Sequence, residues 1–219
     1  MLNLKKIIGI LAASMSISTA ATAGPIVLNF EGVADLASVN DFYNGGTDSA
    51  GNSGTNYGIS FSSTSLGIID SDSGGSGNFA NEPSSSTVLF FTDGTAATMN
   101  VAAGFDTGFS FFYSSNAAGF VRAYDGLNGT GNLLASLTFG ANITGCGGDP
   151  SGTYCRFDPV GVTFNGIARS VDFGGSANNV GFDDITLGSV NAGDVPEPAT
   201  LALSVLGLIG LGAARRRKA

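Results

Sequence analysis

The sequence of 219 residues contains no histidine and no tryptophan, and only 12% of its residues are charged. Without histidine, a serine or cysteine nucleophile has no imidazole base, and a zinc site loses its usual nitrogen ligand. The absence of tryptophan removes a common sugar-stacking side chain. Any acid-base chemistry would therefore depend on carboxylates, and we expect a protein that is not an enzyme.

Positive charge is scarce between Gly24 and Gly193. This stretch holds three arginines, no lysine and fifteen acidic residues, which gives a net charge of −12. Such a surface repels phosphate, so we expect no nucleic-acid partner, but it attracts divalent cations. The length suits one domain with a single hydrophobic core.

The same stretch lacks any long amphipathic helical pattern. Phe109, Phe111 and Tyr113 alternate with serines, and residues 133–139 show a similar alternation of apolar and hydroxyl side chains. This period of two is typical of half-buried strands. The sequence predicts an all-β fold, a single antiparallel β-sandwich of the jelly-roll type. The expected strands are 26–30, 59–62, 87–91, 98–101, 108–114, 120–124, 133–139, 160–164, 169–173 and 180–187, with loops at 44–56 and 70–86.

The amino-terminal segment has the pattern of an export signal. Lys5 and Lys6 precede an apolar run at 7–17, and Ala21-Thr22-Ala23 forms the small-x-small site that a signal peptidase cleaves. We expect residues 1–23 to be a signal peptide that is removed between Ala23 and Gly24. The domain 24–193 would then be exported.

The carboxyl-terminal segment 194–219 has three parts. Val195, Pro196, Glu197 and Pro198 form a stiff, extended motif, because each proline fixes its own φ and restricts the residue before it. Residues 199–214 carry no charge and would span roughly 24 Å as a helix, less than the ~30 Å hydrocarbon core. The cations that follow would stay cytoplasmic, and they are Arg215, Arg216, Arg217 and Lys218. We expect a short transmembrane helix that anchors the protein in the inner membrane for a time.

This order of motif, apolar segment and basic end resembles the PEP-CTERM sorting signal. The resemblance implies processing by an exosortase, a membrane protease of Gram-negative bacteria whose genes accompany those for exopolysaccharide. It also implies a final place at the outer surface of the cell envelope or in the extracellular biofilm matrix. Segments 125–131, 168–173 and 181–185 resemble other proteins with such tails, which implies a β-sandwich outside the cell but no established activity.

The sequence has only two cysteines, Cys146 and Cys155. In an exported protein, two cysteines separated by a turn-rich segment predict a disulfide. Two isolated thiols with no histidine are a poor basis for a metal site.

Three carboxylates are the candidate metal ligands: Glu31, directly after the first expected strand, and Asp183 and Asp184 in the last one. The apolar phase of Val180 and Phe182 passes to Ile185, which predicts a β-bulge at the two aspartates. If the first and last strands are adjacent, these acids could form a structural Ca²⁺ site. The arrangement loosely resembles the calcium site of jelly-roll carbohydrate-binding modules. The alternative is that the acids are solvated carboxylates at a sheet edge.

Together these features indicate an exported, exosortase-processed protein of the envelope or extracellular matrix, with a structural or polysaccharide-associated role. One alternative is a calcium-dependent carbohydrate-binding module, in which Tyr43, Tyr57 and Tyr124 are the available polar aromatic residues. A second alternative is a glycosidase that uses two of the acids.

Overall fold

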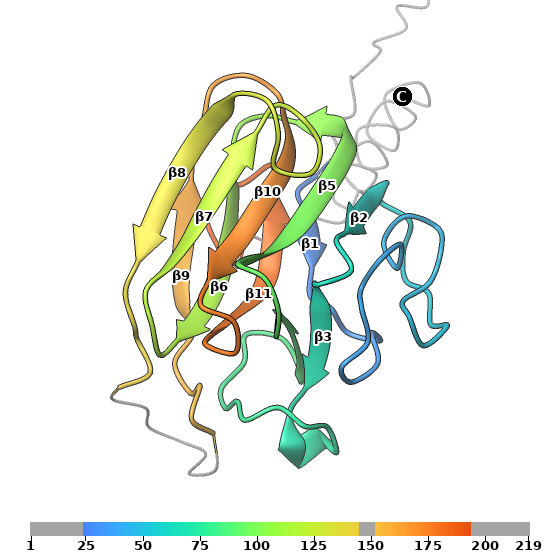
Figure 1. Ribbon diagram of the computed structural model, residues 1–219, viewed down its shortest axis with the longest axis vertical. Coiled ribbons are helices and arrows are strands. Elements are labelled where there is room, and N and C mark those ends of the chain that lie inside the picture. Colours follow the sequence, from blue (N-terminus) through green and yellow to red (C-terminus); the bar gives the residue numbers. More distant parts are fainter. Residues whose placement is uncertain (1–23, 145–151, 194–219) are drawn as a thin grey trace, which may run out of the picture.

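Eleven β-strands form two antiparallel sheets that pack face to face in the computed structural model, which describes residues 24–144 and 152–193 (Figure 1). The first sheet contains β1 (Ile26–Leu28), β3 (Leu66–Ile69), β4 (Thr87–Phe90), β6 (Phe109–Ser115), β9 (Asp158–Val162) and β11 (Val180–Leu187). The second sheet contains β2 (Ile59–Phe61), β5 (Ala96–Phe105), β7 (Gly119–Tyr124), β8 (Leu133–Phe139) and β10 (Ala168–Gly175). The predicted all-β sandwich is confirmed.

The strand order is that of a jelly roll. The first sheet runs β3-β4-β11-β6-β9, with β1 also paired to β11, and the second runs β2-β5-β10-β7-β8. From β4 onward the chain alternates between the sheets, except at the β7–β8 hairpin, and this is the double Greek-key path of the jelly roll. The first strand and the last strand lie side by side (Figure 1).

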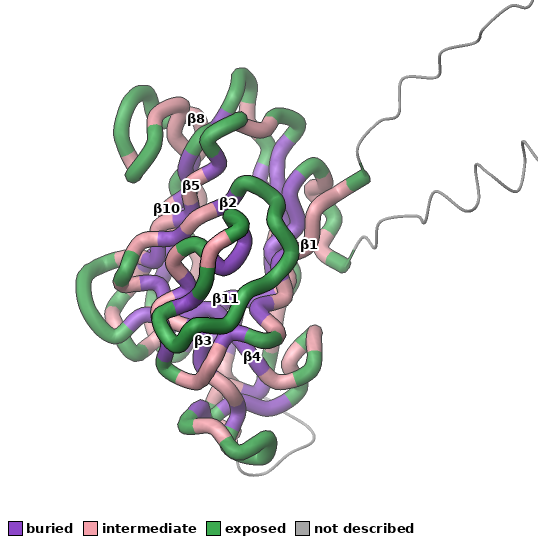
Figure 2. The backbone as a smooth tube through the Cα atoms, turned by 90° about the vertical axis from the view of Figure 1, so that its right-hand side faces the viewer, coloured by how far each residue is buried: buried purple, intermediate pink, exposed green. Residues whose placement is uncertain are grey.

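The core between the sheets is built mainly from phenylalanine. Phe109 and Phe111 of β6 pack edge-to-face against Phe173 of β10, with ring centroids 6.0 and 5.7 Å apart. Phe182 of β11 packs on the same ring at 5.2 Å. All four side chains are fully buried, and the buried residues run through the middle of both layers (Figure 2). The inward face that alternation predicted for β6 is therefore confirmed.

The alternation in β8 is confirmed only in part. Ala135, Leu137 and Phe139 pack on the core, but Leu133 is 53% exposed and Leu134 packs there instead. The ladder between β7 and β8 shifts register between Ala123 and Tyr124, which changes the face to which the first residues of β8 point. The sequence prediction placed Leu133 on the wrong side.

The structure contains one strand that the sequence analysis missed. β3 pairs with β4 along its whole length, and it carries Gly67 at a position where a Cβ atom would lie 2.6 Å from a methyl carbon of Val33. A glycine inside a short apolar run is usually a sign of a turn, but here it allows the preceding segment to pack closely on the strand. The loops at 44–56 and 70–86 are found as predicted, apart from a 3₁₀ turn (η1, Ser71–Ser73).

A second, smaller core covers part of the outer face of the first sheet. It consists of Ile68, Phe79, Val88 and Phe90, with Tyr154 and Phe157 packed against it. Phe79 lies close above Gly181 of β11, where a Cβ atom would be 3.2 Å from the ring. Segments 70–86 and 152–157 are thereby held on the outer face of the first sheet.

Candidate functional site

A β-bulge interrupts β11 at the two aspartates. Asp183 is opposite Phe112 of β6, whereas Thr186 is opposite Ser110, so residues 184 and 185 together face a single residue of β6. Asp184 has a φ of 45°, which is uncommon for a residue other than glycine. The bulge predicted from the change in apolar phase is confirmed. It returns Ile185 to the core and leaves Asp183 on the outer face.

The bulge lies where the neighbour of β11 changes. Ile185 pairs with Leu28 of β1, whereas Phe182 pairs with Leu89 of β4, so β1 ends and β4 begins beside the two aspartates. Segments 29–31 and 84–87 meet at this junction, and the Ser84 hydroxyl contacts the Asn29 carbonyl oxygen at 3.5 Å. The topology therefore brings the three predicted acids to one place, even though Glu31 and Asp183 are far apart in sequence.

Asp183 is fully buried at this junction. Its carboxylate accepts hydrogen bonds from the backbone N–H and the hydroxyl of Ser84, at 3.3 and 3.2 Å, and from the N–H of Asp184 at 2.7 Å. Burial raises the pKa of Asp183 to about 8, the neighbouring Asp184 charge adds to the rise, and these hydrogen bonds oppose it. The interpretation of this acid as a solvated edge carboxylate is therefore wrong.

The other two acids lie on either side of the same loop. Oε1 of Glu31 accepts hydrogen bonds from the N–H groups of Ser86 and Thr87, at 3.0 and 2.8 Å, and fixes the start of β4. Asp184 is half-buried. Burial raises its pKa, a hydrogen bond with Ser84 lowers it, and the Glu31 charge raises it again. Glu31 and Asp183 together hold residues 84–87 on the outer face of the sheet.

Within residues 24–144 and 152–193, no group of three or more acidic, cysteine or histidine side chains is arranged to hold a metal ion. Glu31 and Asp183 direct carboxylate oxygens to N–H and O–H donors of the loop. These bonds occupy oxygens that a Ca²⁺ ion would need. Calcium binding by Glu31, Asp183 and Asp184 stays a prediction.

A pocket of about 420 Å³ opens beside Asp184 on the outer face of β6 and β11. Two aromatic residues line it, Phe112 of β6 and Phe157 just before β9. The other lining residues are Val27, Asn81, Pro83, Asp184, Thr186 and Gly193. Thr186 donates its hydroxyl hydrogen to the Asp184 carbonyl, and Asn81 donates its amide to the Cys155 carbonyl. The bulge thus buries Asp183 beneath Ser84 and places Asp184 at the pocket.

The sequence analysis did not identify the aromatic residues of this pocket. Phe112 lies between the inward residues Phe111 and Tyr113, so the alternation of β6 already implied a large apolar side chain on the outer face. Phe157 and Ser84 gave no such signal, because they lie in irregular segments.

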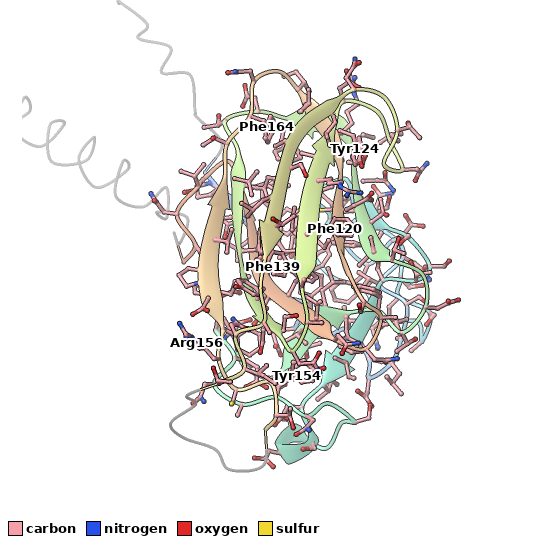
Figure 3. The ribbon with its side chains drawn as sticks, turned by 60° about the vertical axis from the view of Figure 1, so that its left-hand side comes forward. Phe120, Tyr124, Phe139, Tyr154, Arg156 and Phe164 are labelled. Atoms are coloured by element: carbon pink, nitrogen blue, oxygen red, sulfur yellow. The ribbon has the colours of Figure 1, made fainter. Side chains whose placement is uncertain are left out.

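The tyrosines expected as possible ligand contacts have different environments. Tyr43 is 4% exposed, and burial raises its pKa above the usual value for tyrosine. Its hydroxyl oxygen accepts the Phe30 N–H at 2.8 Å, so Tyr43 is a core residue and not a surface contact. Tyr57 stacks on it and is 39% exposed. Tyr124 lies with Phe120 on the outer face of β7 in the second sheet (Figure 3).

Several predicted features lie outside the described residues. They are the signal peptide with Ala23, the sorting tail from residue 194 onward, and Cys146. Cys155 is described and is not a free thiol, but its pairing with Cys146 stays a prediction. In the described part of the chain, no helix is long and apolar enough to cross a membrane.

Comparison with known protein families finds a match in the carboxyl-terminal segment. Residues 194–218 match the family model of the PEP-CTERM protein-sorting motif. The predicted recognition of the tail is therefore confirmed, and it implies an exported protein that an exosortase sorts at the membrane of a Gram-negative bacterium. No curated protein matches the chain.

Proposed function

We propose that the β-sandwich is an extracellular, polysaccharide-associated protein that acts by binding and not by catalysis. The sorting motif at 194–218 carries this proposal, because it implies delivery of the domain across the membrane. The resemblance of the tail to signals that accompany exopolysaccharide genes supports polysaccharide as the partner. The outer surface of the envelope or the extracellular matrix is the corresponding location.

The chemistry of the domain favours binding over turnover. Residues 24–193 contain neither histidine nor lysine, so a base or acid near pH 7 has to be a carboxyl group with a raised pKa. Asp183 has such a pKa, but it is fully buried beneath Ser84. A group that touches no substrate cannot transfer a proton to it.

Two other functions are supported by specific observations and are tested in parallel. A calcium-dependent mode of binding is supported by the grouping of Glu31, Asp183 and Asp184. Burial raises the pKa values of both aspartates, the Asp184 charge adds to the rise at Asp183, and the Glu31 charge adds to the rise at Asp184. A carboxylate glycosidase is supported by the raised pKa of Asp184, which lines the pocket.

The test uses the full chain purified in detergent and the exopolysaccharide of an exosortase-bearing host. We expect the protein to sediment with the polysaccharide and to release no reducing ends from it. Retention that disappears with a chelator would favour the calcium-dependent mode. Hydrolysis that is lost in Asp184→Asn would replace the proposal by the glycosidase. A protein that is neither retained nor active would leave only an inert structural role.

A further inference from the structure

We propose that the pocket between Phe112, Phe157 and Asp184 is the sugar-binding site of this protein, and that it takes a neutral sugar unit. This inference rests on the proposed polysaccharide association, which it extends by naming the site and the ligand class. The pocket volume of about 420 Å³ lies within the range of ~300–1,000 Å³ usual for small-molecule sites.

The lining combines the two kinds of surface that a sugar ring needs. A sugar presents apolar C–H groups on its faces and hydroxyl groups around its rim. Phe112 and Phe157 supply aromatic surface from two different segments, and both are half-buried, so they are held by packing and still reach the pocket. The Asp184 carboxylate can accept hydrogen bonds from hydroxyl groups, and such charge-assisted bonds are short and strong.

The charges at the pocket indicate a neutral ligand. No lysine or arginine is among its lining residues, and the domain carries a net charge of −12, so a uronate or phosphate unit would be repelled.

The side of the pocket formed by Asn81 and Pro83 is held in place where β1 and β4 meet beside β11. Asn81 and Pro83 belong to the loop that Asp183 and Glu31 hold through Ser84, Ser86 and Thr87. One side of the pocket is therefore attached to the sheet by hydrogen bonds that do not involve the ligand. A preformed pocket of this kind loses little conformational entropy on binding.

The second sheet offers a matched control surface. Phe120 and Tyr124 are half-buried aromatic residues on the outer face of β7, with Arg122 between them, and neither is part of the pocket lining (Figure 3). Replacing one of them by alanine removes a comparable aromatic side chain from the opposite side of the sandwich.

The experiment measures retention of the full chain, purified in detergent, on insoluble neutral glucan, mannan and acidic alginate. We expect Phe112→Ala and Asp184→Asn to weaken retention on a neutral polysaccharide at least tenfold, and Phe120→Ala and Tyr124→Ala to change it less than twofold. Melting curves check that each variant is folded, and Phe157→Leu is the second aromatic variant if Phe112→Ala unfolds.

Each outcome separates the site from the function. Retention that is unchanged in Phe112→Ala, Phe157→Leu and Asp184→Asn would overturn the site and leave the proposed function intact. Loss of retention in Phe120→Ala or Tyr124→Ala alone would move the site to the second sheet. Tighter retention on alginate than on either neutral polysaccharide would overturn the ligand class. No retention of the unmodified protein on these materials or on the host's exopolysaccharide would overturn the proposed function itself.

Discussion

The hydroxyl oxygen of Tyr43 accepts a hydrogen bond of 2.8 Å from the backbone N–H of Phe30, a residue that has a φ of 59°. This bond satisfies a buried donor at the point where the chain leaves β1 and turns toward Glu31. The two rings also pack edge-to-face, with centroids 6.0 Å apart. Tyr43 thus stabilises an uncommon backbone conformation directly beside the acid junction.

Replacing Tyr43 by phenylalanine is expected to lower the free energy of unfolding by about 1–3 kcal/mol. The ring remains, but the N–H of Phe30 is left buried and without its acceptor. Urea denaturation of the full chain measures the change. Tyr57→Phe is the control, because its side chain is partly exposed and should cost less than about 0.5 kcal/mol. Equal losses in both variants would contradict the role of the Tyr43 hydroxyl.

The stability of the domain should fall as the pH rises from about 4 to about 8. The folded pKa of Asp183 is raised from 3.8 to about 8. In this range the unfolded chain ionises Asp183 while the folded protein keeps the proton, so unfolding becomes easier as the pH rises and then levels off. In Asp183→Asn this contribution is absent. Denaturation curves between pH 4.5 and pH 8.5 test it, and parallel slopes for the two proteins would disprove the buried, protonated state.

Calcium should raise the melting midpoint if the three acids bind it. An ion at a hundred times its Kd adds about 2.7 kcal/mol to the free energy of unfolding. Melting the full chain with Ca²⁺ and with a chelator measures this shift, and Glu31→Gln should reduce it. An unchanged midpoint would leave Glu31 and Asp183 solely as acceptors for the N–H groups of residues 84–87.

Gly67→Ala is expected to destabilise the domain by about 1–3 kcal/mol. The new Cβ atom would lie 2.6 Å from a methyl carbon of Val33, a β-branched and buried side chain that has little freedom to move. Gly140→Ala is the matched control, because no atom lies within 4 Å of the position of its Cβ atom. Thermal melts should separate the two variants, and a Gly67→Ala protein as stable as the control would show that the contact relaxes without cost.

The sorting tail makes a prediction that can be tested without any ligand. In a host that has an exosortase, the mature exported protein should lack the basic end 215–218, and this is measured by mass spectrometry. Replacing Pro196 and Pro198 by alanine removes the stiffness of the motif and should leave the basic end in place. Ser204→Ala keeps the motif and the apolar character of the following segment, so its processing should be unchanged. An intact basic end in the unmodified protein would contradict exosortase processing.

The sequence predicted most of the strands because their side chains alternate. The limits predicted for residues 133–139 and 180–187 agree with β8 and β11. The bulge could also be predicted, because Phe182 and Ile185 both face the core although they are three residues apart. β3 was missed, since it is short and contains glycine, and its stability comes from pairing with β4 and packing against Val33.

The partners of the candidate site could not be predicted in the same way. Asp183 and Ser84 are 99 positions apart, and only the complete strand order brings them together. The burial of Tyr43 likewise depends on the fold of a loop that has no periodic pattern. Sequence patterns describe which face a strand residue takes, whereas the neighbours across a junction depend on topology.

The pairing of β1 with β11 has a consequence for the timing of folding during export. A chain that crosses a membrane with its amino end first delivers β1 at the start and β11 at the very end. β11 is also the central strand that joins β1 and β4 to β6. The first sheet therefore cannot assemble completely until residues up to Leu187 have crossed. Only residues 188–193 then separate β11 from the start of the sorting motif. In a chain that crosses in this order, the first sheet is completed only after β11 has crossed, directly before the segment that contains the sorting motif.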